Sequence, residues 1–366
     1  MFFLFLFIAI LAVLVLALFY LTMRIRDVIL RGRSPKEVDK SQRRKAWLFA
    51  LIPVAILIVW CIIKPYVAVL VALHLVIFLG LLDLIFALVK VIFHKKVPFY
   101  LPLAMAVVIT IVYMSIAYYL AIHVVETRYQ VTTDKDIPDI RIAMIGDSHI
   151  GTTFDGEGFA EHLKAIEESH PDMLIIAGDF VDDDTKREDM ECACQALGDM
   201  DLTYGVFYSP GNHDEGYSEY RDFTYDDLLK EMKKNGIYIL EDHVVQLEEN
   251  LYVVGRKDRS MKRMPIEELV GPLGEDAYTI VIDHQPNDYK NESECGCGLV
   301  LSGHTHGGQM IPIGHLGVLI GANDSTYGLS SRGDTDFIVT SGISDWAVPF
   351  KTGTKSEYCI IDVTKE

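Results

Sequence analysis

The stretch VLSGHTHGGQM covers residues 300–310. An apolar run ends at a glycine, two histidines follow with one residue between them, and two more glycines come next. Histidines at positions i and i+2 of a turn can face one point in space, and small neighbours let other backbone approach closely. This pattern predicts that His304 and His306 hold a ligand just past the end of a buried strand.

Seven further apolar runs alternate with helical patterns between residues 138 and 366. The runs at 140–146, 172–178 and 298–303 are almost continuously apolar, as in strands buried on both faces. Phe159, Leu163 and Ile166 have helical spacing between the first two strands. Alternation on this scale is typical of strand–helix–strand units, so we predict an α/β domain. The predicted strands are 140–146, 172–178, 205–210, 251–255, 278–283, 298–303, 337–342 and 358–363.

Polar residues with glycine or proline beside them follow five of these strands. In open α/β sheets, ligands bind at the carboxyl ends of the strands. A single aspartate in such a place is more often a turn residue or a helix cap, but five groups in phase with five strands indicate one site. The groups are Asp147 and His149; Asp179; Asn212, His213 and Asp214; Asp283 and His284; and His304 and His306.

The side chains in these groups favour a transition-metal site. Imidazoles and carboxylates without thiolates suit zinc, iron or manganese, and they disfavour calcium and iron–sulfur clusters. Seven or eight candidates exceed the four ligands of one tetrahedral site. They fit two metals ~3.5–4 Å apart that share a carboxylate, as in many phosphatases and nucleases.

The motifs, taken in order, resemble those of the calcineurin-like metallophosphoesterases over about residues 138–366. They are GDSH (146–149), GD (178–179), GNHD (211–214), DHQP (283–286) and SGHTHGGQ (302–309). With apolar spans before it, the last motif is most similar to the bacterial membrane-associated phosphodiesterase branch (YkuE/YaeI-like). Ser148 departs from the leucine that is usual in this branch, at a position that is not a ligand in the family.

This resemblance implies a two-sheet α/β sandwich with helices outside and two divalent metal ions (Mn, Zn or Fe). It implies hydrolysis of a phosphate ester, with a phosphodiester favoured, by in-line attack of a metal-bridging hydroxide. His213 would stand beside the leaving-group oxygen as a proton donor or charge stabiliser, and Asp214 would orient it. One metal would be held by Asp147, His149, Asp179 and His306, and the other by Asp179, Asn212, His284 and His304.

Residues 1–125 form a separate, apolar and basic part of the chain, with 13 Lys+Arg against 4 Asp+Glu. Apolar stretches at 1–23, 46–63, 66–89 and 97–125 are each close to or above the ~20 residues that span a bilayer. A cleaved signal peptide is the weaker interpretation of the first stretch, which lacks a basic start. We therefore predict a four-span transmembrane region (1–125), a linker (126–137) and a metallophosphoesterase domain (138–366). Basic loops at 24–45 and 90–96 predict that the N-terminus and the domain lie outside the cytoplasm.

The acidic charge of residues 126–366 and the four predicted spans limit the kinds of binding partner that we expect. Residues 126–366 carry 20 Lys+Arg against 47 Asp+Glu, which argues against a nucleic-acid-binding surface but not against a phosphorylated substrate beside a metal. Four spans exceed the needs of an anchor, so a lipid-linked substrate is a hypothesis. Two alternatives stay open: a metal-binding sensor or scaffold without turnover, and a transporter that uses Asp83 and His74. Arg256, Arg259 and Arg332 fall in predicted loops and are interpreted as surface residues, and the six cysteines predict no particular disulfide.

Overall fold

The computed structural model describes residues 2–33, 37–217 and 220–366. The chain forms two compact units, Met1–Ile116 and Ala117–Glu366, which we call the helical unit and the sheet unit. The boundary falls inside the fourth helix, so the last residues of that helix belong to the sheet unit.

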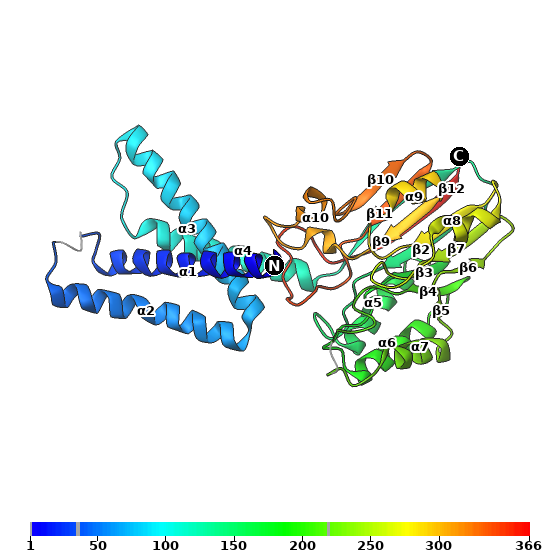
Figure 1. Ribbon diagram of the computed structural model, residues 1–366, viewed down its shortest axis with the longest axis horizontal. Helices are drawn as coiled ribbons and strands as arrows, with labels where there is room; N and C mark the ends of the chain where they lie inside the picture. The colour runs from blue at the N-terminus through cyan, green and yellow to red at the C-terminus, as the bar shows by residue number, and fades with distance from the viewer. Residues whose placement is uncertain (1, 34–36, 218–219) are drawn as a thin grey trace. The chain divides into compact units, whose positions relative to one another are not determined.

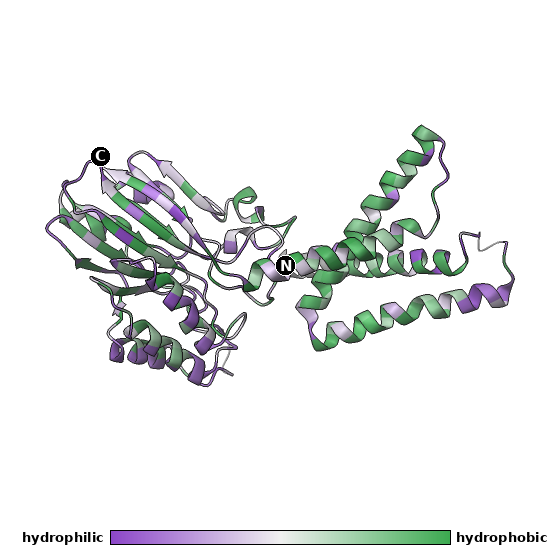
Figure 2. Ribbon diagram, turned by 180° about the vertical axis from the view of Figure 1, so that it is seen from behind, coloured by the Kyte–Doolittle hydropathy of each residue, from purple (hydrophilic) through white to green (hydrophobic). Residues whose placement is uncertain are grey.

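Long apolar helices make up the helical unit, as the hydropathy colours show (Figure 2). Asp39 caps the second helix, because its side chain accepts a hydrogen bond from the backbone N–H of Gln42. In the third helix, Asp83 accepts hydrogen bonds from Tyr20 and Arg24 of the first, which confirms a helix–helix contact for this acid. The helices are α1 (Phe2–Ile29), α2 (Lys40–Ile63), α3 (Pro65–Phe93) and α4 (Leu101–Ile122).

Within the described part of the chain, three helices, α2, α3 and α4, are long and apolar enough to cross a membrane. The sequence predicted four spans, and this count is corrected to three. The predicted first span, residues 1–23, falls in α1, and the side chains of its first eleven residues lie outside the described part.

Two mixed six-stranded sheets form the centre of the sheet unit (Figure 1). In the first sheet, β2 to β5 are parallel neighbours, and in the second β7, β8, β9 and β11 are parallel. The first sheet has the order β1 (Val125–Thr133), β12 (Glu357–Lys365), β2 (Ile140–Ile145), β3 (Met173–Ala177), β4 (Gly205–Ser209) and β5 (Tyr238–Ile239). The second has the order β10 (Gly328–Arg332), β11 (Thr335–Val339), β9 (Leu299–Ser302), β8 (Tyr278–Ile282), β7 (Leu251–Gly255) and β6 (His243–Gln246).

All eight strands predicted from the sequence are present, and four more were not predicted. Strand β1 lies where the sequence predicted a linker, and it pairs in parallel with β12 over nine residues. Its sequence VETRYQVTT is polar enough to suggest a linker, but its Val, Thr and Tyr residues suit an edge strand. The other unpredicted strands are β5, β6 and β10.

The buried side chains of the sheet unit form three layers, one between the two sheets and one on the outer face of each sheet. One buried cluster takes residues from both sheets, such as Ile175 and Ile280, so the two sheets pack face to face. The outer face of the first sheet is covered by three helices, α5 (Gly156–Glu167), α6 (Arg187–Gly198) and α7 (Tyr225–Lys234). Phe159 of α5 and Cys194 of α6 are buried against it. The outer face of the second is covered by α8 (Ile266–Val270) and α9 (Tyr289–Glu294). Shorter elements are η1 (Gly271–Leu273), η2 (His306–Gly308) and α10 (Leu316–Leu319).

Arg256 differs from its predicted surface position, because its side chain is buried just after β7. Its Nη1 lies 2.7 Å from Asp283, 2.8 Å from Asp288 and 3.2 Å from Glu292, so one cation contacts three carboxylates. Arg263 adds a second cation, with its Nη1 2.9 Å from Asp283. This ion cluster lies next in sequence to His284 and supports the turn that carries it.

Replacing Arg256 by alanine is expected to lower the free energy of unfolding by about 3–5 kcal/mol, because buried carboxylates lose their counter-charge. The matched control is Arg332→Ala, on the exposed face of β10, for which the expected change is within about 0.5 kcal/mol. The urea midpoint of the full chain in detergent micelles measures both. Equal midpoints for the two variants would contradict a stabilising role for the cluster.

Candidate metal centre

The polar strand ends of the two sheets meet at one place. The first sheet contributes the residues after β2, β3 and β4, and the second contributes those after β8 and β9. The strand ends meet because the two sheets pack face to face and their parallel strands end on the same side. The predicted residues that converge there are Asp147, His149, Asp179, Asn212, His213, His284, His304 and His306.

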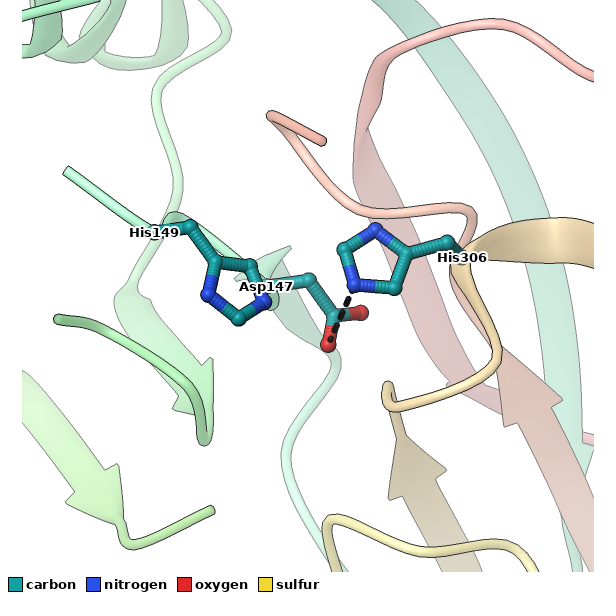
Figure 3. A group of neighbouring side chains, drawn as sticks. All are labelled: Asp147, His149 and His306. Atoms are coloured by element: carbon teal, nitrogen blue, oxygen red, sulfur yellow. Dashed lines mark ion pairs between the residues drawn. The ribbon is translucent and has the colours of Figure 1, made fainter. Parts of the chain in front are cut away.

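One group of side chains combines Asp147 and His149 of the first sheet with His306 of the second (Figure 3). All three are buried, and one ligand atom from each lies within 4.8 Å of the others. The Nε2 of His306 is 3.7 Å from Asp147 Oδ1, and the rings of His149 and His306 stack with centroids 5.1 Å apart. This is an arrangement that can hold a metal ion.

A second group combines Asp179, His284 and His304, again with ligand atoms within 4.8 Å of one another. The Nε2 of His284 lies 3.1 Å from Asp179 Oδ2. Asn212 joins this group, because its Oδ1 lies 2.9 Å from His304 Nδ1. The second group therefore offers one carboxylate, one amide oxygen and two imidazoles.

Asp179 lies between the two groups. Its Oδ2 is 3.1 Å from His284 Nε2 in the second group and 3.7 Å from His149 Nε2 in the first. Its Oδ1 accepts a hydrogen bond of 2.8 Å from the backbone N–H of His213. A carboxylate in this position can be shared by two metal ions.

Five of the converging residues have left-handed backbone conformations that are unusual outside glycine. Such residues cost about 1–3 kcal/mol each and persist only where the surroundings hold them, commonly at functional sites. Gly211 shows how tightly the surroundings are packed, since a Cβ atom there would overlap the Asp179 carboxylate. The five φ angles are 51° at Asp147, 37° at His149, 50° at Asp179, 68° at His304 and 48° at His306.

The buried polar atoms fit a metal better than they fit one another. Most buried polar atoms in proteins have a hydrogen-bond partner. Here Asp147 Oδ2 and His306 Nδ1 have none among the described residues, and His284 Nε2 and the ring nitrogens of His149 have only carboxylate oxygens 3.1 to 3.7 Å away. His284 Nδ1 donates to the carbonyl oxygen of Ala177 at 2.8 Å, which fixes the ring so that Nε2 is free to be a ligand.

Burial sets the protonation of the histidines. It lowers the pKa of His306 well below its ordinary value and that of His304 to about 4, so both rings are neutral near pH 7 and can donate a lone pair. For His284, burial lowers the pKa, but the charge of Asp179, a hydrogen bond to Asp179 and the charge of Asp147 together outweigh burial and raise the pKa well above its ordinary value. A proton shared by His284 and Asp179 would have to leave before His284 Nε2 could hold a metal ion.

His213 lies at the rim, and its partner differs from the one predicted. Its Nδ1 lies 3.0 Å from Asp182 Oδ1, and its ring makes an edge contact with His149. Asp214, predicted to orient His213, is instead buried and accepts hydrogen bonds from the backbone N–H groups of Asp179, Phe180, Val181 and Gly211. Burial opposes a proton on His213, but the hydrogen bond to Asp182 and the nearby carboxylates raise its pKa. Asp182 also has Oδ2 3.1 Å from His149 Nδ1.

Comparison with known proteins identifies the domain. Residues 140–308 match the family model for calcineurin-like phosphoesterases. The chain therefore contains a calcineurin-like metallophosphoesterase domain, and the family consists of hydrolases that act on phosphoric esters and normally use a dinuclear metal centre.

Three relatives show how far the similarity extends. An uncharacterized metallophosphoesterase of Campylobacter jejuni is 29% identical over 63% of this chain and 62% of its own length. The uncharacterized metallophosphoesterase YkuE of Bacillus subtilis is 24% identical over 67% of this chain and 87% of its own. A transmembrane protein with metallophosphoesterase domain of Danio rerio is 26% identical over 61% of this chain and 53% of its own. The chain thus spans less than two thirds of the length of the first and third relatives.

Changing Asp179 to Asn is expected to weaken metal binding by more than about 100-fold, because both groups lose a shared charge. The control is Asp184→Asn, five residues on and exposed, with unchanged affinity expected. Calorimetric titration of manganese into the metal-stripped full chain, in detergent micelles, measures both. An Asp179→Asn protein with the affinity of the unmodified chain would contradict the shared position of this carboxylate.

Proposed function

We propose that this protein is a membrane-anchored phosphoesterase with a dinuclear metal centre, that it favours phosphodiesters, and that its substrate is linked to a lipid. The observation that carries the proposal is the meeting of two buried histidine–aspartate groups at Asp179, with His213 beside them. The family assignment supports the reaction class.

In this proposal each group holds one metal ion, and Asp179 belongs to both. Manganese, zinc or iron suits the imidazole and carboxylate donors. When bound, the metal pair supplies charge that polarises the phosphoryl oxygens and activates a water nucleophile. The first metal is assigned to Asp147, His149, Asp179 and His306, and the second to Asp179, Asn212, His284 and His304.

His213 and Asp182 supply the proton chemistry. Asp182 accepts the Nδ1–H of His213 and so leaves Nε2 available to the substrate. The raised pKa of His213 favours a proton on the ring, which it can give to the leaving-group oxygen. Asp182 acts as a positioning residue, since it orients His213 without a contact to the phosphate.

Charge around the centre favours diesters over monoesters. The carboxylates of Asp182 and Asp258 act on the histidines of the centre, and a monoester with two negative charges is repelled more strongly than a diester with one. The chain as a whole carries a net charge of −18, which also repels a doubly charged monoester more than a singly charged diester.

The membrane part of the proposal rests on α2, α3 and α4 and on the loops between them. The Lys- and Arg-rich segments before α2 and after α3 belong on the cytoplasmic side by the positive-inside rule. With three crossings, we infer a sheet unit outside the cytoplasm, whether or not α1 also enters the bilayer. The relative from Danio rerio, named a transmembrane protein, supports the anchoring.

The full chain in detergent micelles is expected to hydrolyse bis-p-nitrophenyl phosphate faster than p-nitrophenyl phosphate, and only after metal is restored to the stripped protein. The variant His213→Ala should keep its metal and lose about 10²–10⁴-fold in kcat, because it lacks the proton donor. Release of nitrophenolate measures both. Firm metal binding with no turnover of either substrate would contradict the proposal and favour a sensor.

Asp182→Asn is expected to lower kcat by roughly 10-fold or more, because His213 loses its orienting partner. The same change added to His213→Ala should have little further effect, since the two residues act as one unit. Asp184→Asn, which is exposed, is the control. Independent, multiplicative losses in the double variant would show that Asp182 acts through His149 or the fold rather than through His213.

A further inference from the structure

An exposed apolar segment follows the last metal-centre motif. From Met310 to Ala322 the sequence has no Asp, Glu, Lys or Arg, although the rest of the sheet unit is rich in charge. Leu319 is 80% exposed and Ile320 is 70% exposed. Figure 2 shows α10, within this segment, in the hydrophobic colour. Large exposed apolar patches mark surfaces that contact a partner or a membrane. The exposed side chains of this apolar segment are Ile311, Ile313, Leu316, Val318, Leu319 and Ile320.

The apolar segment is held firmly against the metal centre. Two residues after His306, the backbone of Gly308 packs closely on that of Gly314. A Cβ atom at either glycine would overlap the backbone of the other. The side-chain Nε2 of Gln309 donates to the carbonyl oxygens of Trp346, Val348 and Phe350, at 3.1 to 3.4 Å. The segment therefore cannot move far without disturbing the turn that carries His306.

The loop that accepts these bonds is joined to the end of α4. The backbone N–H of Lys351 donates to Ala117, and that of Ser356 donates to Leu120, at 3.0 and 2.9 Å. Tyr118 of the same helical turn contacts the ring of Phe350, with centroids 5.8 Å apart. These contacts all lie within the sheet unit.

Exposed tyrosines mark the level of this helix end. Tyr118 and Tyr119 are 46% and 56% exposed in the last turns of α4, and tyrosines collect at the boundary between membrane and water. A crossing of the membrane by α4, which is a candidate span, would put the loop that it binds at that boundary. The apolar segment, bonded to the same loop through Gln309 and Thr352, stays beside it.

Trp346 connects this surface to the reactive edge of the centre. Its side chain is 41% exposed, and its ring lies against His213 with centroids 6.0 Å apart. A substrate at the boundary would therefore meet Trp346 and His213 together.

We propose that residues 311–320 enter the boundary layer of the bilayer that α4 crosses, and that they present the metal centre to a phosphate ester carried on a lipid. This inference deepens the proposed function and rests on it for the chemistry. A bilayer is favoured over a protein partner because the segment is bonded to the loop that is itself bonded to the end of α4, a candidate span, and because it has no Asp, Glu, Lys or Arg for a protein interface rim.

Fluorescence quenching tests the membrane contact without relying on activity. The full chain is reconstituted in vesicles with Trp47, Trp60 and Trp346 changed to Phe, and a tryptophan is introduced by Leu319→Trp. Lipids brominated in the acyl chains should quench it at least about twofold, because an interfacial apolar segment reaches the headgroup–acyl boundary. The matched control is Leu329→Trp on β10, 42% exposed, for which little quenching is expected. Equal quenching at both positions, or none at 319, overturns the proposal.

Turnover tests the consequence for substrates. The double variant Leu319→Gln, Ile320→Gln should hydrolyse dioleoyl phosphatidyl-p-nitrophenol in vesicles roughly tenfold more slowly than the unmodified chain. Soluble bis-p-nitrophenyl phosphate should be hydrolysed at an unchanged rate. Equal losses on the two substrates would overturn the proposal, as would a smaller oligomer for the double variant than for the unmodified chain together with no quenching at 319. Quenching at 319 with no turnover of either substrate would support the membrane contact and count against the proposed hydrolysis.

Discussion

The metal centre depends on hydrogen bonds that cross between the two sheets. His284, which follows β8 of the second sheet, donates through Nδ1 to Ala177 at the end of β3 in the first. In the same way the backbone N–H of His304 donates to Asp147 Oδ1 at 2.9 Å. These bonds fix the strand ends of one sheet against those of the other, so that Asp179 lies within reach of histidines from both. The candidate site therefore forms only when the two sheets pack together. The same packing holds the site residues in their left-handed backbone conformations.

All eight predicted strands are present and the predicted ligand residues converge in the fold, because both have strong local signals in the sequence. Buried parallel strands such as 172–178 are continuous apolar runs, and the residues that follow them are conspicuous when histidines and aspartates recur in phase. Edge strands have weaker signals, which is why β1 resembled a linker and the two-residue β5 was missed. The prediction of four spans was corrected to three among the described residues.

Tertiary contacts, in contrast, could not be inferred from spacing. Asp182 stands three residues after Asp179, and the GDFVDD sequence offers three acids of which only the fold selects a partner for His213. Asp214, adjacent to His213 in sequence, is directed into backbone N–H groups instead. Arg256 is buried because carboxylates distant in sequence surround it. The apolar segment 311–320 lacks strand or helix periodicity of any length, and only its exposure in the fold makes it notable.

A stoichiometric metal titration tests whether two metal ions that share Asp179 together support hydrolysis. Manganese is added to the metal-stripped full chain at a concentration well above its dissociation constant, and hydrolysis of bis-p-nitrophenyl phosphate is followed against metal equivalents. If two metal ions act together, the rate of hydrolysis rises until two equivalents are bound and then stays constant. Saturation of the rate at one equivalent, or two bound equivalents with no hydrolysis, would contradict this joint action.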